Sequence, residues 1–237
     1  MRIDKYLQEK FNLRSRTYAE NLIKKGLVQV NGNKVVKTSF DVNDGDDVQI
    51  LSDENYASQG AYKLLEAINK FSLNLDGLDC IDVGCSNGGF TDCLLRHDAN
   101  RVLAVDVADC ALPENIVADP RVEFLKANAR NLVLEEKFDF ACSDVSFISL
   151  RYILPTLFSA LKNGGRAVVL VKPQFELDKS ALNKKGIVTS ERDREKAVAA
   201  VRGYASDNGF TIEGFAVSPV FYEDKNVEYL MLLRKPD

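Results

Sequence analysis

The sequence predicts an α/β fold in which a mainly parallel sheet, covered by helices on both faces, ends in an antiparallel hairpin and follows a small α+β module. Beyond residue 60, apolar runs of strand length alternate with helical segments, which is typical of a parallel sheet buried on both faces. The last two apolar runs are joined by the short stretch FYEDKN. A parallel crossover needs about a dozen residues or more, so this pair is expected to be antiparallel.

The first module is predicted over residues 1–52. Apolar residues at helical spacing fill residues 3–11, and Ser15 is a candidate N-cap for a second helix that ends at Gly26. The stretch LVQVNGNKVV then predicts two strands around an Asn31-Gly32 turn, followed by a further turn and strand. Residues 53–60 are polar and rich in turn formers, so we expect a linker there and a larger domain over residues 61–237.

The larger domain is expected to contain seven strands and four main helices. Its strands are predicted at residues 79–83, 101–107, 122–126, 138–144, 166–172, 211–220 and 228–234. Its helices are predicted at residues 61–71, 90–96, 150–161 and 191–208.

Charge is distributed unevenly along the chain. The whole chain has a formal net charge of −4, yet residues 1–40 hold nine basic and three acidic groups, which leaves that segment at +6. A basic end on an acidic body predicts a module that binds a polyanion.

The cysteines and the hydropathy exclude several classes of protein. The five cysteines form no CxxC pair and His97 is the single histidine, so neither a disulfide framework nor a metal site is expected. The N-terminus lacks the apolar core of a signal peptide, and no apolar run reaches the roughly 18 residues of a membrane span. We therefore expect a cytoplasmic protein with reduced thiols and no membrane span; the sequence does not predict its oligomeric state.

The most specific local signal is the sequence CIDVGCSNGGF at residues 80–90. A glycine-rich turn here joins the end of a strand to the start of a helix, where ligands bind in doubly wound sheets. The pattern is neither the dinucleotide GxGxxG nor a Walker A loop, and it matches the D-x-G-x-x-x-G-G-F form of an S-adenosylmethionine-binding loop. The cofactor-binding residues expected in it are Asp82, Gly84, Ser86, Gly88, Gly89 and Phe90.

Two later polar residues follow strands at the same edge of the predicted sheet. Asp106 ends its strand about twenty residues after the glycine turn, where an acid can hydrogen-bond a ribose diol; the alternative is a solvated Asp at a strand end. Asn128 follows the next strand and could contact an adenine edge, although a simple turn asparagine is an equal alternative.

Charged residues also end the middle strands. Asp144 and Lys172 end two strands over the same expected cleft, which favours a functional role for both. Glu228 opens the final strand, and Lys63 lies near the start of the first helix of the larger domain. Considered singly, each of the latter two is typical of a surface charge.

These motifs carry a resemblance to known families. Residues 2–51, through RIDKYL and VQVNG, resemble the S4 RNA-binding domain. Residues 57–235, through VGCSNGGFTDCLL, SDVSFISL, VKPQFE and NVEYL, resemble the FtsJ-like 2′-O-methyltransferase domain, with the Rossmann-like sheet of class I methyltransferases. The two together resemble the TlyA family of ribosomal RNA 2′-O-ribose methyltransferases, whose members are often labelled hemolysins.

The resemblance implies specific residues, a cofactor and a partner. It implies S-adenosylmethionine as the cofactor, ribosomal RNA or ribosomal subunits as the partner, and Gly84, Ser86, Gly88, Asp106, Asn128 and Asp144 as cofactor contacts. The family's Lys-Asp-Lys-Glu tetrad corresponds to Lys63, Asp144, Lys172 and Glu228. The basic residues expected to contact RNA phosphates are Arg2, Lys5, Arg14, Arg16, Lys24 and Lys25.

The expected reaction leaves two roles open for one residue. Lys172 is our first choice as the base that removes the 2′-hydroxyl proton. Alternatively, Lys172 stays charged and stabilises the developing alkoxide, with the proton leaving to Asp144 or water.

Three loops depart from the family pattern, at Gln59 and Ala61, at residues 108–110 and at residues 221–225. If these changes abolish catalysis, the alternative is a non-catalytic RNA-binding, ribosome-associated factor with a degenerate methyltransferase domain. The hemolysin label suggests a further, less favoured alternative, a membrane-active hemolysin.

Overall fold

A computed structural model describes residues 1–11, 13, 15–24, 26–50, 56–219 and 225–237 of the chain. The chain divides into two compact units, Met1–Asn55 and Tyr56–Asp237. The described part of the expected linker, residues 56–60, belongs to the second unit: Tyr56 is fully buried in the core of that unit, and the Ala57 N–H donates to Asp92 Oδ2 at 2.7 Å. The second unit therefore includes residues 56–60, which their polar composition assigned to the linker.

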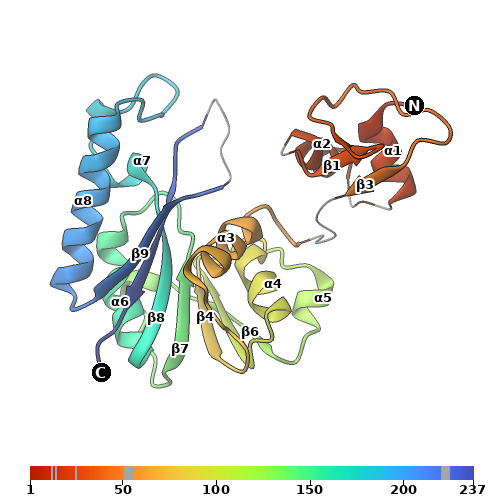
Figure 1. Ribbon diagram of the computed structural model, residues 1–237. Helices are drawn as coiled ribbons and strands as arrows, with labels where there is room; N and C mark the ends of the chain where they lie inside the picture. The colour runs from red at the N-terminus through yellow and green to blue at the C-terminus, as the bar shows by residue number, and fades with distance from the viewer. Residues whose placement is uncertain (12, 14, 25, 51–55, 220–224) are drawn as a thin grey trace. The chain divides into compact units, whose positions relative to one another are not determined.

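The first unit packs two helices on a small antiparallel sheet (Figure 1). Helix α1 is Ile3–Lys10 and helix α2 is Arg16–Lys24, capped by Ser15, whose hydroxyl accepts from the Tyr18 N–H at 3.1 Å. Strands β1 (Val28–Val30), β2 (Asn33–Lys34) and β3 (Val48–Ile50) pair in the order β2-β1-β3. Asn31 and Gly32 have φ of +51° and +78°, as the predicted hairpin turn requires.

The second unit is built on a seven-stranded mixed sheet. Its strands are β4 (Asp79–Val83), β5 (Arg101–Asp106), β6 (Val122–Lys126), β7 (Phe138–Ser143), β8 (Leu161–Val171), β9 (Thr211–Val217) and β10 (Tyr229–Arg234). Their order is β6-β5-β4-β7-β8-β10-β9. The strands from β6 to β8 run parallel, and β10 is antiparallel to both β8 and β9, so the predicted terminal hairpin is confirmed.

Helices cover both faces of this sheet (Figure 1). One face packs against α3 (Ala61–Phe71) and α4 (Gly89–Arg96), and the other packs against α6 (Leu154–Ala160) and α8 (Glu191–Asp207). Successive residues of a strand point to opposite faces: Cys80 of β4 lies in the first core and Ile81 in the second. A parallel sheet buried on both faces explains why its strands read as continuous apolar runs.

Several element bounds differ from the prediction. Strand β8 begins at Leu161, because NGG at residues 163–165 continues the strand through an irregular register against β7 instead of forming a loop. The helix predicted at residues 150–161 is divided into a 3₁₀ turn, Leu150–Tyr152, and α6, with Pro155 in its first turn. Two short helices, α5 (Glu114–Val117) and α7 (Pro173–Glu176), were not predicted because each has a single turn and too few residues to show a period.

The strand order creates one topological switch point. From β4 the chain adds β5 and β6 on one side, and then returns to add β7 and β8 on the other. Ligands bind beyond the carboxyl ends of the strands at such a point. Gly84 follows the end of β4 and Asp144 follows the end of β7. Both residues therefore lie where a ligand is expected to bind.

Candidate functional site

A large open cavity lies at the switch point of the second unit. Its volume is about 830 Å³, which is within the range of small-molecule and cofactor sites. The walls come from the segment before α3, from the loops after β4, β5, β6, β7 and β8, and from residues 225–228 before β10. Every loop at the carboxyl edge of the parallel strands therefore contributes to one space.

The glycine loop after β4 is folded by its own backbone. Gly84 has φ of +88°, and its N–H donates to Val105 O at 2.8 Å, which ties the loop to β5. A Cβ on Gly84 would lie 3.0 Å from Val145 Cγ1, so a larger residue would crowd the loop after β7. Gly88 has φ of +75°, and a Cβ there would lie 2.9 Å from both Leu112 and Ile116. Glycine is thus required at two points by backbone angle and by close approach together.

The carboxylate of Asp106 is fixed by two backbone donors. Its Oδ2 accepts from the Ser86 N–H and its Oδ1 accepts from the Ala108 N–H, each at 3.0 Å. This joins the end of β5 to the glycine loop and leaves the remaining lone pairs of the carboxylate available for a ligand. Ala108 lies in one of the three loops that depart from the family pattern. It contributes its backbone N–H, which does not depend on the identity of the side chain.

Asn128 is a turn asparagine that also faces the cavity. Its side-chain oxygen accepts from the Arg130 N–H at 3.1 Å and so caps a short 3₁₀ turn, Ala129–Asn131. Asn128 also lines the cavity. The turn contact uses the amide oxygen, so the amide nitrogen can still donate to a ligand.

Four charged side chains form a continuous chain of ion pairs at one wall of the cavity. Lys63 Nζ lies 2.7 Å from Glu228 Oε2 and 3.1 Å from Asp144 Oδ2. Lys172 Nζ lies 2.6 Å from Asp144 Oδ1. The sequence places these four residues in four different segments, and the fold brings all of them together in the order Glu228, Lys63, Asp144, Lys172. All four side chains are less than 20% exposed.

Burial and charge act against each other in this chain of ion pairs. Burial lowers the pKa of Lys63, but the carboxylates of Asp144 and Glu228 outweigh burial and hold the pKa above its ordinary value. Burial raises the pKa of Asp144, but the two ammonium groups outweigh it and hold that pKa below its ordinary value. Lys63 is therefore a cation and Asp144 an anion at neutral pH.

The loop after β7 supplies further groups beside Lys172. Lys172 Nζ donates to Ser146 Oγ at 2.9 Å. The next residue, Phe147, has φ of +64° and a side chain that is 91% exposed, and its ring centroid lies 5.2 Å from that of Phe175. A non-glycine residue in the left-handed region is strained, and strain of this kind gathers at functional sites. Ser146 and Phe147 both line the cavity.

Two of the predicted cofactor residues do not line the cavity. Asp82 is fully buried beneath it, where its Oδ2 accepts from Thr91 Oγ1 at 2.7 Å and so joins β4 to α4. Burial raises the pKa of Asp82 to about 7. Gly88 acts through packing, as described above. The predicted residues that do line the cavity are Lys63, Gly84, Ser86, Gly89, Phe90, Asp106, Asn128, Asp144, Lys172 and Glu228.

Some lining residues were not predicted from the sequence. Ser146, Phe147 and Gln174 lie inside the motifs SDVSFISL and VKPQFE, but their residue types do not distinguish them from their neighbours in those motifs. Lys185 and Asn226 also line the cavity, and no spacing in the sequence connects them with the glycine loop. Of the departing loops, Gln59 and Lys225 line the cavity, while residues 221–224 lie outside the described residues.

The predicted RNA-binding residues of the first unit differ from one another in their surroundings. Arg2 and Arg16 lie 2.9 and 2.7 Å from Oδ2 of Asp4, which is fully buried, so these two cations are held in place on the helix surface. Lys5 and Lys24 are about half exposed and form looser pairs with Glu9 and Glu20, at 3.6 and 3.9 Å. The other two predicted residues, Arg14 and Lys25, lie outside the described residues.

Comparisons with known proteins agree with this division of the chain. Residues 1–48 match the family model of the S4 domain, and residues 56–235 match that of the FtsJ-like methyltransferase. The 16S/23S rRNA (cytidine-2′-O)-methyltransferase TlyA of Mycobacterium tuberculosis is 37% identical over 239 residues, with 98% of this chain and 89% of that protein covered. Hemolysin A of Brachyspira hyodysenteriae is 35% identical over 235 residues, with 97% and 98% covered.

A solved structure shows the same likeness in three dimensions. A Streptococcus thermophilus protein that bears the name hemolysin superposes with a TM-score of 0.75 at 35% identity. The match covers 100% of this chain and 89% of that one. The name refers to membrane lysis, and among the described residues of this chain no helix is long and apolar enough to cross a membrane.

Proposed function

Because the chain belongs to the TlyA family of FtsJ-like methyltransferases with an N-terminal S4 domain, we propose that it transfers a methyl group from S-adenosylmethionine to a ribose 2′-hydroxyl of ribosomal RNA. The single observation that carries the proposal is the chain of ion pairs Glu228–Lys63–Asp144–Lys172 in the wall of the cavity. It adjoins a glycine loop of the kind that holds this cofactor, so a methyl donor and an acceptor hydroxyl could meet there.

The residues present fit S-adenosylmethionine. Gly84 has no side chain, so the glycine loop packs closely against the loop after β7 at the cavity, and Asp106 presents a fixed carboxylate at the end of β5 for a ribose diol. The Asn128 amide nitrogen is a donor on the same rim. When bound, the cofactor supplies an electrophilic methyl group on a sulfonium, which needs no metal ion for its transfer.

Among the four charged residues, some position their neighbours and one is assigned to remove the proton. Lys63 is a cation held between two carboxylates, so it fixes the positions of Asp144 and Glu228. Asp144 is a weak proton acceptor because its pKa is lowered, and its charge holds Lys172 in the cavity wall. We assign removal of the acceptor-hydroxyl proton to Lys172, which lines the cavity with its Nζ 2.9 Å from Ser146 Oγ.

The first unit supports RNA as the substrate. Lys5, Lys10 and Lys24 project from its helices, and exposed cations of this kind contact phosphates without reading bases. Binding of the RNA should therefore weaken steeply as salt is added.

The experiment is methyl transfer from radiolabelled S-adenosylmethionine to purified unmethylated ribosomal subunits, with cofactor binding measured in parallel by calorimetry. We expect label on one ribose 2′-oxygen, and loss of transfer in Lys172→Ala with cofactor affinity retained. Lys172→Arg tests the role of the base, because an arginine keeps the charge but does not give up its proton. Activity in Lys172→Arg would assign a purely electrostatic role to the lysine. A protein that binds RNA but not the cofactor would be a non-catalytic binding factor.

A further inference from the structure

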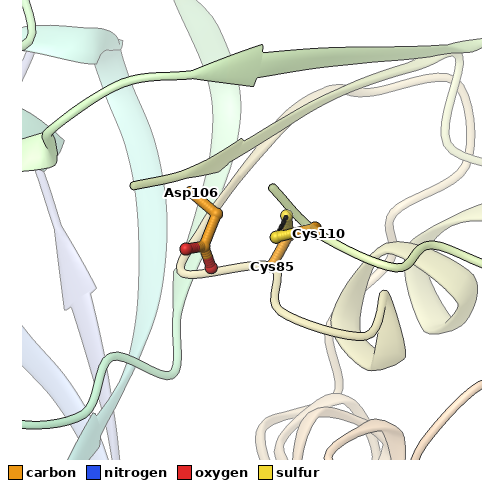
Figure 2. A group of neighbouring side chains, drawn as sticks. All are labelled: Cys85, Asp106 and Cys110. Carbon is orange, nitrogen blue, oxygen red and sulfur yellow. Dashed lines mark hydrogen bonds between the residues drawn. The ribbon is translucent and has the colours of Figure 1, made fainter. Parts of the chain in front are cut away.

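Two thiols and a carboxylate lie together beside the cofactor cavity, at Cys85, Asp106 and Cys110 (Figure 2). Cys85 belongs to the glycine loop, Asp106 ends β5 and Cys110 lies in the segment that follows. The two Sγ atoms are 3.8 Å apart, and one ligand atom from each of the three residues lies within 4.8 Å of the others. The sequence did not predict this group, because its two thiols are 25 positions apart and match no metal-binding spacing.

We propose that Cys85, Asp106 and Cys110 bind a thiophilic divalent cation such as Zn²⁺, and that this cation competes with S-adenosylmethionine. Two sulfur atoms and one carboxylate oxygen are a ligand set that zinc accepts, and a water completes the tetrahedron. With Zn–S bonds of about 2.3 Å, the two sulfurs of a tetrahedral site lie roughly 3.8 Å apart, which is the distance already present. Each thiol releases one proton as its sulfur binds the metal, so one zinc ion displaces two protons.

Burial of the two thiols slows their oxidation to a disulfide. Burial raises the pKa of the Cys85 thiol, and the neighbouring Asp82 and Cys110 raise it further. Burial, and then Asp106, raise the pKa of the Cys110 thiol as well. Neutral thiols react slowly with peroxides, because the thiolate is the nucleophile.

Competition with the cofactor follows from the shared residues. Cys85 and Asp106 both line the cavity, and Asp106 is the carboxylate that we assign to the cofactor ribose. A metal bound to that carboxylate occupies the acceptor that the ribose needs. This part of the inference rests on the proposed function, whereas metal binding itself does not.

The test uses the reduced, metal-free full-length protein. Zn²⁺ is titrated against a chromophoric chelator, and Co²⁺ is used as a spectroscopic probe because thiolate ligands give an intense charge-transfer band. We expect one equivalent of metal and a thiolate band, both lost or weakened by roughly tenfold or more in Cys110→Ser. Cys110 does not line the cavity, so Cys110→Ser should bind S-adenosylmethionine normally.

The matched control is Cys93→Ala. Cys93 and His97 form a separate close pair of possible ligands, with Sγ and Nδ1 3.8 Å apart, and this variant leaves the proposed group intact. Unchanged metal affinity in Cys110→Ser, or loss of metal affinity in Cys93→Ala, would overturn the site.

Competition with the cofactor is tested separately. Addition of S-adenosylmethionine to the Co²⁺ complex should remove the thiolate band. Simultaneous binding of metal and cofactor would contradict the proposed competition. Metal binding by a protein that, when metal-free, does not bind S-adenosylmethionine would contradict the proposed function but not the metal site.

Discussion

Lys63 Nζ lies 2.7 Å from Glu228 Oε2, although 165 positions separate the two residues in the chain. The contact joins the first turn of α3 to the residue before β10, so it forms only when the antiparallel end of the sheet has closed onto the parallel part. Glu228 and Asp144 together keep the pKa of Lys63 above its ordinary value. We infer that Glu228 acts through Lys63 to hold Asp144, and through Asp144 to hold Lys172.

The first prediction concerns this relay. In Glu228→Gln the side chain keeps its shape but no longer neutralises Lys63. Asp144 then pairs more strongly with Lys63 and less strongly with Lys172. We expect the rate constant of methyl transfer to fall by roughly tenfold to a hundredfold, while the cofactor Kd changes little. The control is Glu213→Gln, which removes a carboxylate of β9 that pairs with Arg166 at 2.7 Å on the same sheet. Equal loss in both variants would indicate a general effect of charge and not a relay.

The second prediction separates backbone strain from close approach at the glycine loop. Gly84 and Gly77 both have positive φ, +88° and +71°, so alanine at either position is strained by about 1 kcal/mol. At Gly77 a Cβ meets nothing within 4 Å, whereas at Gly84 it lies 3.0 Å from Val145 Cγ1. Gly84→Ala should therefore weaken cofactor binding by roughly tenfold or more, and Gly77→Ala should lose only stability. Calorimetric titration and thermal unfolding of both variants provide the comparison.

The third prediction assigns the carboxylate of Asp106. Asp106→Ala removes the acceptor of two backbone N–H groups and the expected acceptor of the ribose diol, so the cofactor Kd should rise by roughly ten- to a hundredfold. Transfer at saturating cofactor should be largely restored, because the ion-paired residues are untouched. Asp109→Asn is the control, since Asp109 is 85% exposed and pairs with Lys126 instead. An unchanged Kd in Asp106→Ala would remove this residue from the cofactor site.

The sequence contains enough to predict the elements but not the contacts between them. The glycine loop, Asp106 and the strand ends were predictable because a parallel sheet gathers its carboxyl ends at one edge. The pairing of Lys63 with both Asp144 and Glu228 was not, because it depends on the order β8-β10-β9, and the chain does not encode strand order as a local pattern. Asp82 illustrates the opposite case: its motif position predicted a ligand contact, yet its carboxylate is fully buried against α4, where it accepts from Thr91 Oγ1.

The fourth prediction concerns the first unit. Burial raises the pKa of Asp4, but hydrogen bonds from Arg16 and Arg2 outweigh it and lower the pKa below its ordinary value. Ionised Asp4 therefore stabilises the unit above the pKa of the unfolded chain, and this contribution is lost as pH falls through the lower folded pKa. Asp4→Asn should destabilise the unit by about 1–3 kcal/mol at pH 7 and remove that part of the acid dependence. Hydrogen exchange of the amides in α1 and α2 reports on this unit within the full chain.

The fifth prediction concerns Asp82, whose pKa moves in the opposite direction. Burial raises it to about 7, while an Asp in the unfolded chain has a pKa near 3.8. Between about pH 4 and pH 7 the folded protein therefore keeps a proton on Asp82 that the unfolded chain has lost. The stability that protonated Asp82 contributes is full below about pH 4 and is lost as the pH rises towards and through 7.

Asp82→Asn provides the test because its amide has no proton to lose and its oxygen can still accept from Thr91. The free energy of unfolding of the wild-type protein, measured against that of the variant by denaturant titration, should fall by roughly 2–4 kcal/mol between pH 4 and pH 8. Taking the difference removes the other titrating groups, which the two proteins share. Parallel pH profiles would mean that Asp82 is ionised in the folded protein throughout this range, and that Thr91 and its surroundings stabilise a buried charge.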